Sequence, residues 1–120
     1  MNGTDLIAAM DGEPLFDEGD AKFWRVADYE GGLLWVGRWC RTSPWERHAA
    51  GDELLHVLEG VVELTVLTGE GPVSTTLRSG SVFVVPRGMW HRQSASAPVL
   101  QWGATPGVTE HSMADDPRGN

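Results

Sequence analysis

Two short segments near the middle of the chain combine histidine and glutamate with turn-forming residues, which are the groups that a divalent metal ion needs. Glu46, His48 and Glu53 lie in the first segment, residues 45–53, and His91 ends the second. Imidazole nitrogens and carboxylate oxygens that converge from separate strands can bind one ion. The two segments therefore predict a metal site, although they do not identify a substrate.

Composition limits the classes of function. The chain has 120 residues, enough for one compact domain. Its formal net charge is −8 and it has only nine lysine and arginine residues, which disfavours nucleic acid and anionic membranes as partners. Cys40 is a lone cysteine, the N-terminus has no basic and apolar leader, and no apolar run reaches the roughly 20 residues of a membrane span. We therefore expect a cytoplasmic protein.

Most of the chain after residue 20 has the pattern of short β-strands. Runs rich in β-branched and aromatic residues alternate with glycine-containing turns. Before them, residues 6–10 predict a short helix capped by Thr4 or Asp5. The polar residues 110–120 are expected to fray. The pattern predicts antiparallel strands at residues 22–29, 33–41, 54–58, 61–67, 73–78, 81–85 and 99–104.

The first histidine segment resembles the first motif of the cupin superfamily of small β-barrels. That motif places a His-x-His pair, a glutamate and a glycine at fixed spacing. His48, Glu53 and Gly60 match its second half, with four residues and six residues between them. Glu46 stands where the family has the first histidine, so one expected ligand has changed type.

The second histidine segment resembles the second cupin motif. Gly80, Pro86, Gly88 and His91 match the family in spacing. Ala95 replaces an asparagine of the motif. Two motifs with correct spacing inside a strand-rich chain identify the sequence as similar to small single-domain cupins.

The resemblance covers residues 43–95 and implies the fold. We expect an all-β, double-stranded β-helix (jelly-roll) barrel of antiparallel strands with a short N-terminal segment. The expected boundaries are 1–20 for an N-terminal extension, 21–107 for the cupin barrel and 108–120 for a polar C-terminal tail. Because similar small cupins are commonly homodimers, the resemblance also implies a homodimer.

The resemblance implies that Glu46, His48, Glu53 and His91 meet inside the barrel. Residues two apart on a strand face the same side, so Glu46 and His48 would both point inward. His48, Glu53 and His91 make a two-histidine, one-carboxylate set that leaves coordination positions open and suits iron or manganese, with zinc and nickel as further candidates. Glu46 is either a fourth ligand or a catalytic acid or base beside the metal.

Residues near the motifs predict the substrate pocket. Trp45 and Trp90 each adjoin a motif and can frame the entrance. Either Gln101 or Trp102 must face inward from the last strand, and we assign Gln101 to the pocket.

Other residues have expected roles outside the metal set. Trp35 and Trp39 share one face of a strand and predict a pocket wall or a dimer surface. His56 is expected on the face away from the pocket, and His111 in the solvated tail. Cys40 is expected to be a buried apolar residue.

Arginines near the motifs favour a carboxylate-bearing substrate, because a guanidinium group pairs with a carboxylate through two parallel hydrogen bonds. The sequence thus predicts a small metal-binding cupin that acts on a small organic molecule, as a metal-dependent oxygenase, isomerase or lyase if it is an enzyme. The alternative is a noncatalytic barrel that binds or senses a small ligand, with or without metal. The arginines are Arg38, Arg41, Arg47, Arg87 and Arg92.

Overall fold

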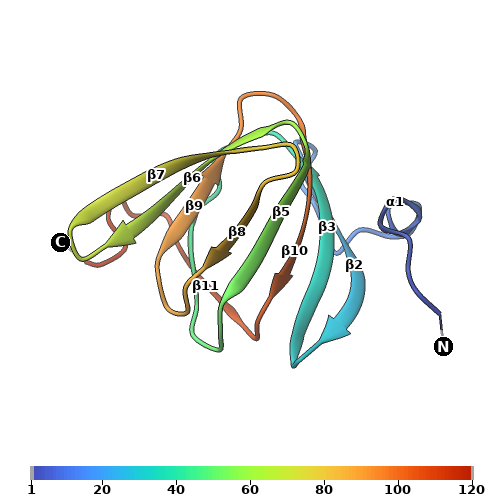
Figure 1. The fold of residues 1–120 in the computed structure, drawn as a ribbon, viewed down its shortest axis with the longest axis horizontal. Helices are drawn as coiled ribbons and strands as arrows, with labels where there is room; N and C mark the ends of the chain where they lie inside the picture. Colours follow the sequence, from blue (N-terminus) through green and yellow to red (C-terminus); the bar gives the residue numbers. More distant parts are fainter. Residues whose placement is uncertain (1, 120) are drawn as a thin grey trace.

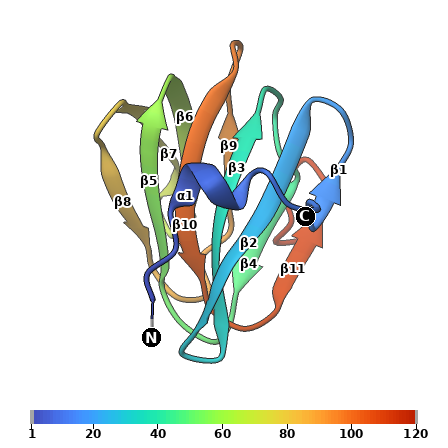
Figure 2. The same cartoon turned by 90° about the vertical axis from the view of Figure 1, so that its right-hand side faces the viewer.

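The computed structural model describes residues 2–119, which form two antiparallel sheets that face each other (Figure 1, Figure 2). Within these residues the first sheet has the strand order β1, β2, β3, β10, β5, β8, with bounds Phe16–Asp17, Ala21–Tyr29, Gly32–Trp39, Val99–Thr105, Glu53–Glu59 and Val82–Val85. The second sheet has the order β11, β4, β9, β6, β7, with bounds Thr109–Ser112, Trp45–His48, His91–Ser94, Val61–Thr68 and Gly71–Arg78. The predicted all-β jelly-roll barrel is confirmed.

The hydrophobic pattern predicts seven of these strands near their observed bounds but not β1, β4, β9 or β11. β4 and β9 carry glutamate, histidine and glutamine on their inner face, so they lack the apolar alternation that marks a half-buried strand. Fraying was expected from residue 110 onward, but residues 110–112 pair with β4 as part of β11. The boundaries of the barrel at 21–107 stay a proposal, and strands on both sides of this range pair with it.

The predicted N-terminal helix is observed as α1, Leu6–Ala9. The Asp5 carboxylate caps it by accepting hydrogen bonds from two backbone N–H groups of the first turn. The helix lies against the outer face of the first sheet (Figure 2), where it packs on buried residues of β2, β3 and β10. Within residues 2–119 no helix is long and apolar enough to cross a membrane.

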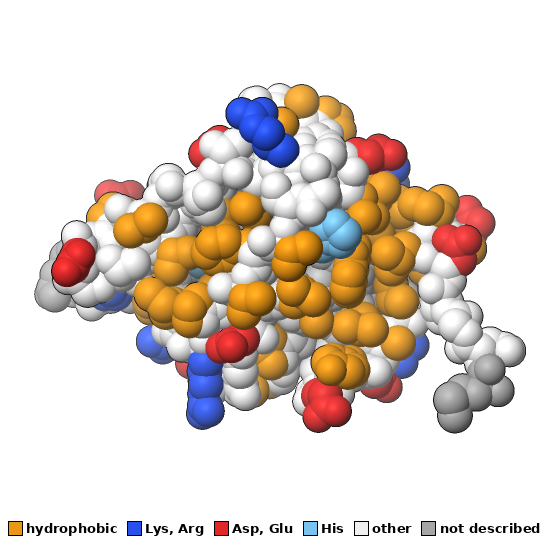
Figure 3. Space-filling view, viewed as in Figure 1, with side chains coloured by type: hydrophobic (Ala, Val, Ile, Leu, Met, Phe, Trp, Pro, Cys, Tyr) orange, Lys and Arg blue, Asp and Glu red, His pale blue; other side chains and the backbone are white. Residues whose placement is uncertain are grey.

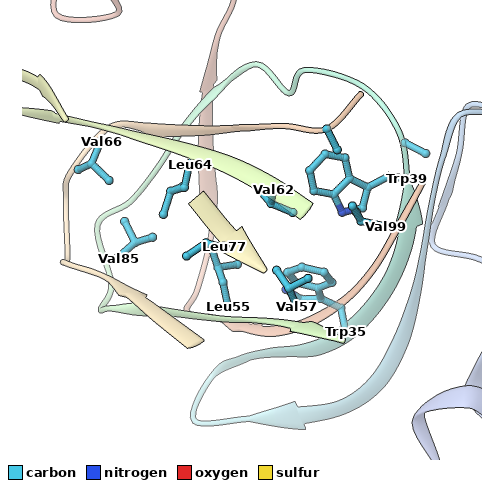
Figure 4. Packing of buried hydrophobic residues seen from close by; sticks show 12 residues of the cluster. Trp35, Trp39, Leu55, Val57, Val62, Leu64, Val66, Leu77, Val85 and Val99 are labelled. Atoms are coloured by element: carbon cyan, nitrogen blue, oxygen red, sulfur yellow. The ribbon is translucent and has the colours of Figure 1, made fainter. Parts of the chain in front are cut away.

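The main core lies between the two sheets and consists of large apolar side chains (Figure 4). Leu55 and Val57 of β5 and Val62 and Leu64 of β6 are fully buried. Full burial of one such side chain contributes about 1.5–3 kcal/mol relative to its exposed state. This cluster therefore supplies much of the stability that holds the polar parts of the interior in place.

Trp35 and Trp39 belong to this core, so their interpretation as a dimer surface is wrong. Their exposed fractions are only 8% and 4%. Gly37 lies between them on β3, and the Phe23 ring covers it: a Cβ atom at Gly37 would lie 2.4 Å from that ring. The apolar strip is thus closed by neighbouring side chains.

Gly103 of β10 leaves the space that the Trp35 ring fills. A Cβ atom at Gly103 would lie 2.6 Å from the backbone oxygen of Leu54 and 2.6 Å from Cζ2 of Trp35. The variant Gly103→Ala should therefore lose about 1–3 kcal/mol of unfolding free energy, as overpacked cores do, measured by urea denaturation. Gly69→Ala is the control, because no atom lies within 4 Å of its Cβ position. A Gly103→Ala variant as stable as the parent would argue against this packing.

Candidate metal centre

Two turns bring the candidate ligands together. His48 is the last residue of β4 and Glu53 the first residue of β5, while β9 begins with His91 directly after the second turn. The turns are bonded to each other, since the backbone N–H of Gly88 donates to the carbonyl oxygen of His48 at 2.9 Å. Gly88 has φ +77°, a left-handed conformation that glycine adopts at little cost. The turns therefore fix the ends of three strands relative to one another.

His48, Glu53 and His91 form a compact buried cluster. Nε2 of His91 lies 3.0 Å from Oε1 of Glu53, and Nε2 of His48 lies 3.2 Å from Oε2. One donor atom from each residue lies within 4.8 Å of the others. The three residues are only 2%, 5% and 2% exposed. Two imidazole nitrogens and a carboxylate around one point form the donor set of a divalent metal site.

Both ring nitrogens of His91 face oxygen acceptors, so a proton or a metal ion is needed between Nε2 and Glu53. Nδ1 of His91 lies 3.1 Å from the carbonyl oxygen of Met89, which only accepts, so Nδ1 carries a proton. Nε2 faces the Glu53 carboxylate, which is a second acceptor. Burial alone would lower the pKa of His91, but Glu53 outweighs burial and raises it. Either a proton on Nε2 or a divalent ion would satisfy the Glu53 carboxylate at this place.

The second imidazole supplies an unused donor atom. Nε2 of His48 is buried and has no hydrogen-bond partner among residues 2–119, because its contact with Glu53 lacks hydrogen-bond geometry. Leaving such an atom unsatisfied costs about 1–3 kcal/mol. A metal ion beside the Glu53 carboxylate would bind this nitrogen, so the residues present fit a divalent metal.

Glu53 is held as a charged carboxylate. Burial would raise its pKa, but the imidazoles of His48 and His91 outweigh burial and lower the pKa to about 2. Oε2 also accepts a hydrogen bond from the Thr105 hydroxyl, which in turn accepts from the indole N–H of Trp35 at 2.8 Å. Because an indole N–H only donates, the hydroxyl proton of Thr105 is free to point at the carboxylate. This relay fixes the orientation of Glu53.

Sequence reasoning missed Thr105, although a signal for it existed. Gln101, Gly103 and Thr105 alternate along β10, so placing Gln101 inward also places Thr105 inward. No comparable signal pointed to Met89, which orients His91 through its backbone oxygen.

Glu46 lies beside the cluster but outside the group of three donors. It is the cross-strand neighbour of His91 on one side and of His111 on the other, so the three side chains share the inner face of the second sheet. Its Oε2 lies 3.5 Å from Nε2 of His111, and the side chains of Glu46 and His111 are 28% and 58% exposed. Burial and the charge of Glu53 raise the pKa of Glu46, against the opposing effect of the histidines. Its role as ligand or as acid and base stays a prediction.

The two predicted pocket tryptophans lie on the outer side of the second sheet. Trp45 and Trp90 each directly precede a residue of the inner face, so their side chains point the opposite way. The guanidinium carbon of Arg92 lies 4.4 Å from the Trp45 ring centroid, and that of Arg47 lies 4.5 Å from the Trp90 ring centroid. The structure thus does not bring either ring to the donor cluster.

Gln101 points into the barrel, as assigned, and is fully buried. Its amide accepts a hydrogen bond from the Trp39 indole at 3.1 Å and donates one to Gln93 at 2.6 Å. Trp102 points outward and donates to Nδ1 of His56 at 2.8 Å, so His56 lies on the face away from the cluster, as expected. Gln101 therefore has its hydrogen bonds within the barrel interior.

The arginines near the motifs do not surround the cluster, and their positions do not support the expected recognition of a substrate carboxylate. Arg47 and Arg92 lie on the outer side of the second sheet. The other arginine side chains have partners or positions away from the cluster. Arg38 is exposed on the outer face of β3, and Arg41 pairs with Glu18 and Asp20. Arg47 pairs with Glu110, and Arg87 donates to the carbonyl oxygen of Ala49.

Two hollows of the described surface also lie away from the three donors. One, of about 440 Å³, is lined by Trp90, Arg47 and the C-terminal Arg118 among others. The other, of about 340 Å³, lies between the N-terminal segment and Trp102. Beside the cluster on the inner face, Glu46 and His111 are partly exposed to solvent.

Comparisons with known proteins agree with this architecture. A cupin-domain family profile matches residues 40–98. A cupin-2 domain containing protein from Shewanella frigidimarina NCIMB 400 is 21% identical with a TM-score of 0.61, over 70% of this chain and 78% of that chain. A deletion mutant of Bacillus subtilis oxalate decarboxylase OxdC is 16% identical with a TM-score of 0.72, over 86% of this chain and 31% of that chain. An oxalate oxidase is 17% identical with a TM-score of 0.64, over 79% and 56%.

These likenesses show the fold alone, since each identity is low. The chain spans just over half of the oxalate oxidase chain and about a third of the oxalate decarboxylase chain. No curated protein sequence matches this chain.

The fold and the cluster define a small antiparallel jelly-roll barrel with two histidines and one carboxylate buried in its interior. Together with the match of residues 40–98, they show the family. The chain belongs to the cupin superfamily.

Proposed function

We propose that this cupin binds a divalent metal ion through His48, Glu53 and His91 and uses it to act on a small organic molecule. The observation that carries the proposal is the buried cluster, in which one imidazole nitrogen has no hydrogen bond within residues 2–119 and another faces a carboxylate. When bound, the ion supplies a Lewis acid or a redox centre. Iron and manganese suit this donor set, and zinc and nickel are the other candidates.

We propose Glu46 as the acid and base of the site or as a fourth ligand. It shares the inner face with the donors and is the most exposed of the four residues. Burial and the charge of Glu53 raise the pKa of Glu46, and a positioned carboxyl group can act as a general acid or base. Nε2 of His111 lies 3.5 Å from its Oε2, and His111 is the more exposed of the two side chains.

The proposed substrates are small organic molecules, and the proposed reactions are those of a metal-dependent oxygenase, isomerase or lyase. Support comes from proteins of the same fold that are named as oxalate oxidase, oxalate decarboxylase and DMSP lyases. Small organic acids are therefore the first compounds to screen.

One observation favours the alternative of a noncatalytic, ligand-binding barrel. The three donors are at most 5% exposed, so an ion among them would have little contact with solvent. Such a site can hold a metal for stability instead of turnover. The two functions differ in whether a coordination position stays open.

The metal content of tag-free protein tests the proposal. The parent should carry near-stoichiometric iron, manganese, zinc or nickel in plasma mass spectrometry, and the double variant His48→Ala/His91→Ala should lose it because two of three donors are gone. His56→Ala is the matched control, since this histidine lies on the outer face, where its ring accepts a hydrogen bond from Trp102. A parent that holds no metal and takes up none of the added ions would contradict metal binding.

An open coordination position is tested by water relaxation. The manganese-loaded parent should raise the relaxation rate of water protons above that of the manganese-treated double variant, because three protein donors leave positions for water. Oxalate, used as the probe, should displace this water and reduce the effect. A loaded parent with no enhancement would favour the noncatalytic alternative.

We also propose that two copies associate through the outer face of the first sheet, where apolar side chains gather (Figure 3). Val82 and Val84 of the edge strand β8 are 56% and 50% exposed, and beside them on this face lie His56 and Leu54 of β5. These residues carry no carboxylate, although the chain has a net charge of −8, so a second copy meets no like charge there. A second copy would cover both the apolar face and the open edge of β8.

Light scattering tests this association. The parent should have twice the chain mass of 13.1 kDa, and Val84→Lys should halve the observed mass. Val73→Lys is the control, because Val73 is equally exposed at 56% but lies on β7 of the other sheet. A monomeric parent would rule out the homodimer.

A further inference from the structure

Strand β11 places a hydroxyl group directly behind one of the candidate ligands. Thr109 is the cross-strand neighbour of His48, and its Oγ1 lies 3.1 Å from Nδ1 of the imidazole. The contact lies within regular sheet structure, because β11 runs antiparallel to β4 over four residue pairs. The ring therefore has a polar neighbour on one nitrogen and the donor cluster on the other.

The surroundings of the two nitrogens determine where the proton of a neutral imidazole belongs. Nε2 of His48 is buried and lies 3.2 Å from Oε2 of Glu53, but this contact lacks hydrogen-bond geometry, so Nε2 has no hydrogen bond among residues 2–119. A proton on Nδ1 can donate to the Thr109 hydroxyl. The lone pair then left on Nε2 faces the Glu53 carboxylate, and because the two repel each other, a cation between them favours this tautomer.

The other histidine of the cluster has the same arrangement. Nδ1 of His91 donates to the carbonyl oxygen of Met89, and Nε2 faces Glu53. The backbone oxygen of Met89 accepts the Nδ1 proton of His91, as the Thr109 hydroxyl can accept the Nδ1 proton of His48. Outer hydrogen bonds of this kind fix the tautomer and ring orientation of histidine ligands.

We propose that Thr109 is a positioning residue of the metal centre, which accepts a hydrogen bond from Nδ1 of His48 and so directs Nε2 toward the metal. This inference rests on the proposed metal binding. It gives the C-terminal strand a part in the site, although the sequence predicts only a polar tail there. Loss of such an outer partner typically weakens metal binding by about 10–100-fold.

β11 is anchored independently of Thr109, so a change at this position should leave the strand in place. Arg47 of β4 forms an ion pair with Glu110 of β11 on the outer face. The Trp45 indole N–H donates to the carbonyl oxygen of Asp115 at 3.2 Å. Removal of a single hydroxyl group is therefore a test of the hydrogen bond alone.

The first measurement follows the Nδ1 proton of His48 by NMR in zinc-loaded protein. Zinc on Nε2 leaves this proton on Nδ1, where the hydrogen bond to Thr109 should move its resonance downfield and slow its exchange with water. Thr109→Val, which keeps the side-chain shape but lacks the hydroxyl, should move the resonance upfield and speed the exchange. Thr109→Ser should restore the parent behaviour. An Nδ1 proton that responds to neither variant in zinc-loaded protein would overturn the inference while metal binding stands.

The second measurement is the dissociation constant for manganese, from competition titration. Thr109→Val should raise it by about 10–100-fold, whereas Thr109→Ser should stay close to the parent. Thr65→Val is the matched control, because the Thr65 hydroxyl contacts Ser74 on the outer face of β6, away from the donor cluster. If the parent binds manganese and Thr109→Val binds it equally well, Thr109 has no positioning role while metal binding stands. If the parent binds none, the proposed function itself fails.

Discussion

A buried carboxylate between two imidazoles is the interaction on which the rest of the site depends. Removing a charged group from water costs several kcal/mol unless partners replace the water. Glu53 has such partners in His48, His91 and the Thr105 hydroxyl, and they come from three different strands. Glu53 of β5 therefore connects β4 and β9 of the second sheet and β10 of the first sheet at the cluster that can receive a cation.

The barrel divides its interior between an apolar sector and a polar sector. Valine and leucine of β5 and β6 fill the first, while histidine, glutamate and glutamine of β4 and β9 line the second. Trp35 connects them, because its ring packs in the core and its N–H begins the relay to Glu53. The rigid core thus supports the orientation of the donor atoms.

The sequence predicts the apolar sector and the three donors but only part of their surroundings. Strands with alternating apolar residues follow from the pattern, and the donors follow from motif spacing. Thr109 and His111 could not be foreseen, because β11 forms only by pairing with β4 and has no apolar alternation of its own. The assignments of Trp45 and Trp90 to the pocket rested on nearness in sequence, whereas the pleat turns consecutive residues to opposite faces.

The proposed metal centre consists of His48, Glu53 and His91 around one ion. Anomalous diffraction at the manganese edge from crystals of manganese-loaded protein would locate that ion. We expect a single strong peak within about 2.0–2.2 Å of Nε2 of both histidines and of a Glu53 oxygen. A peak at other residues, with Nε2 of His91 still hydrogen-bonded to Glu53, would contradict it.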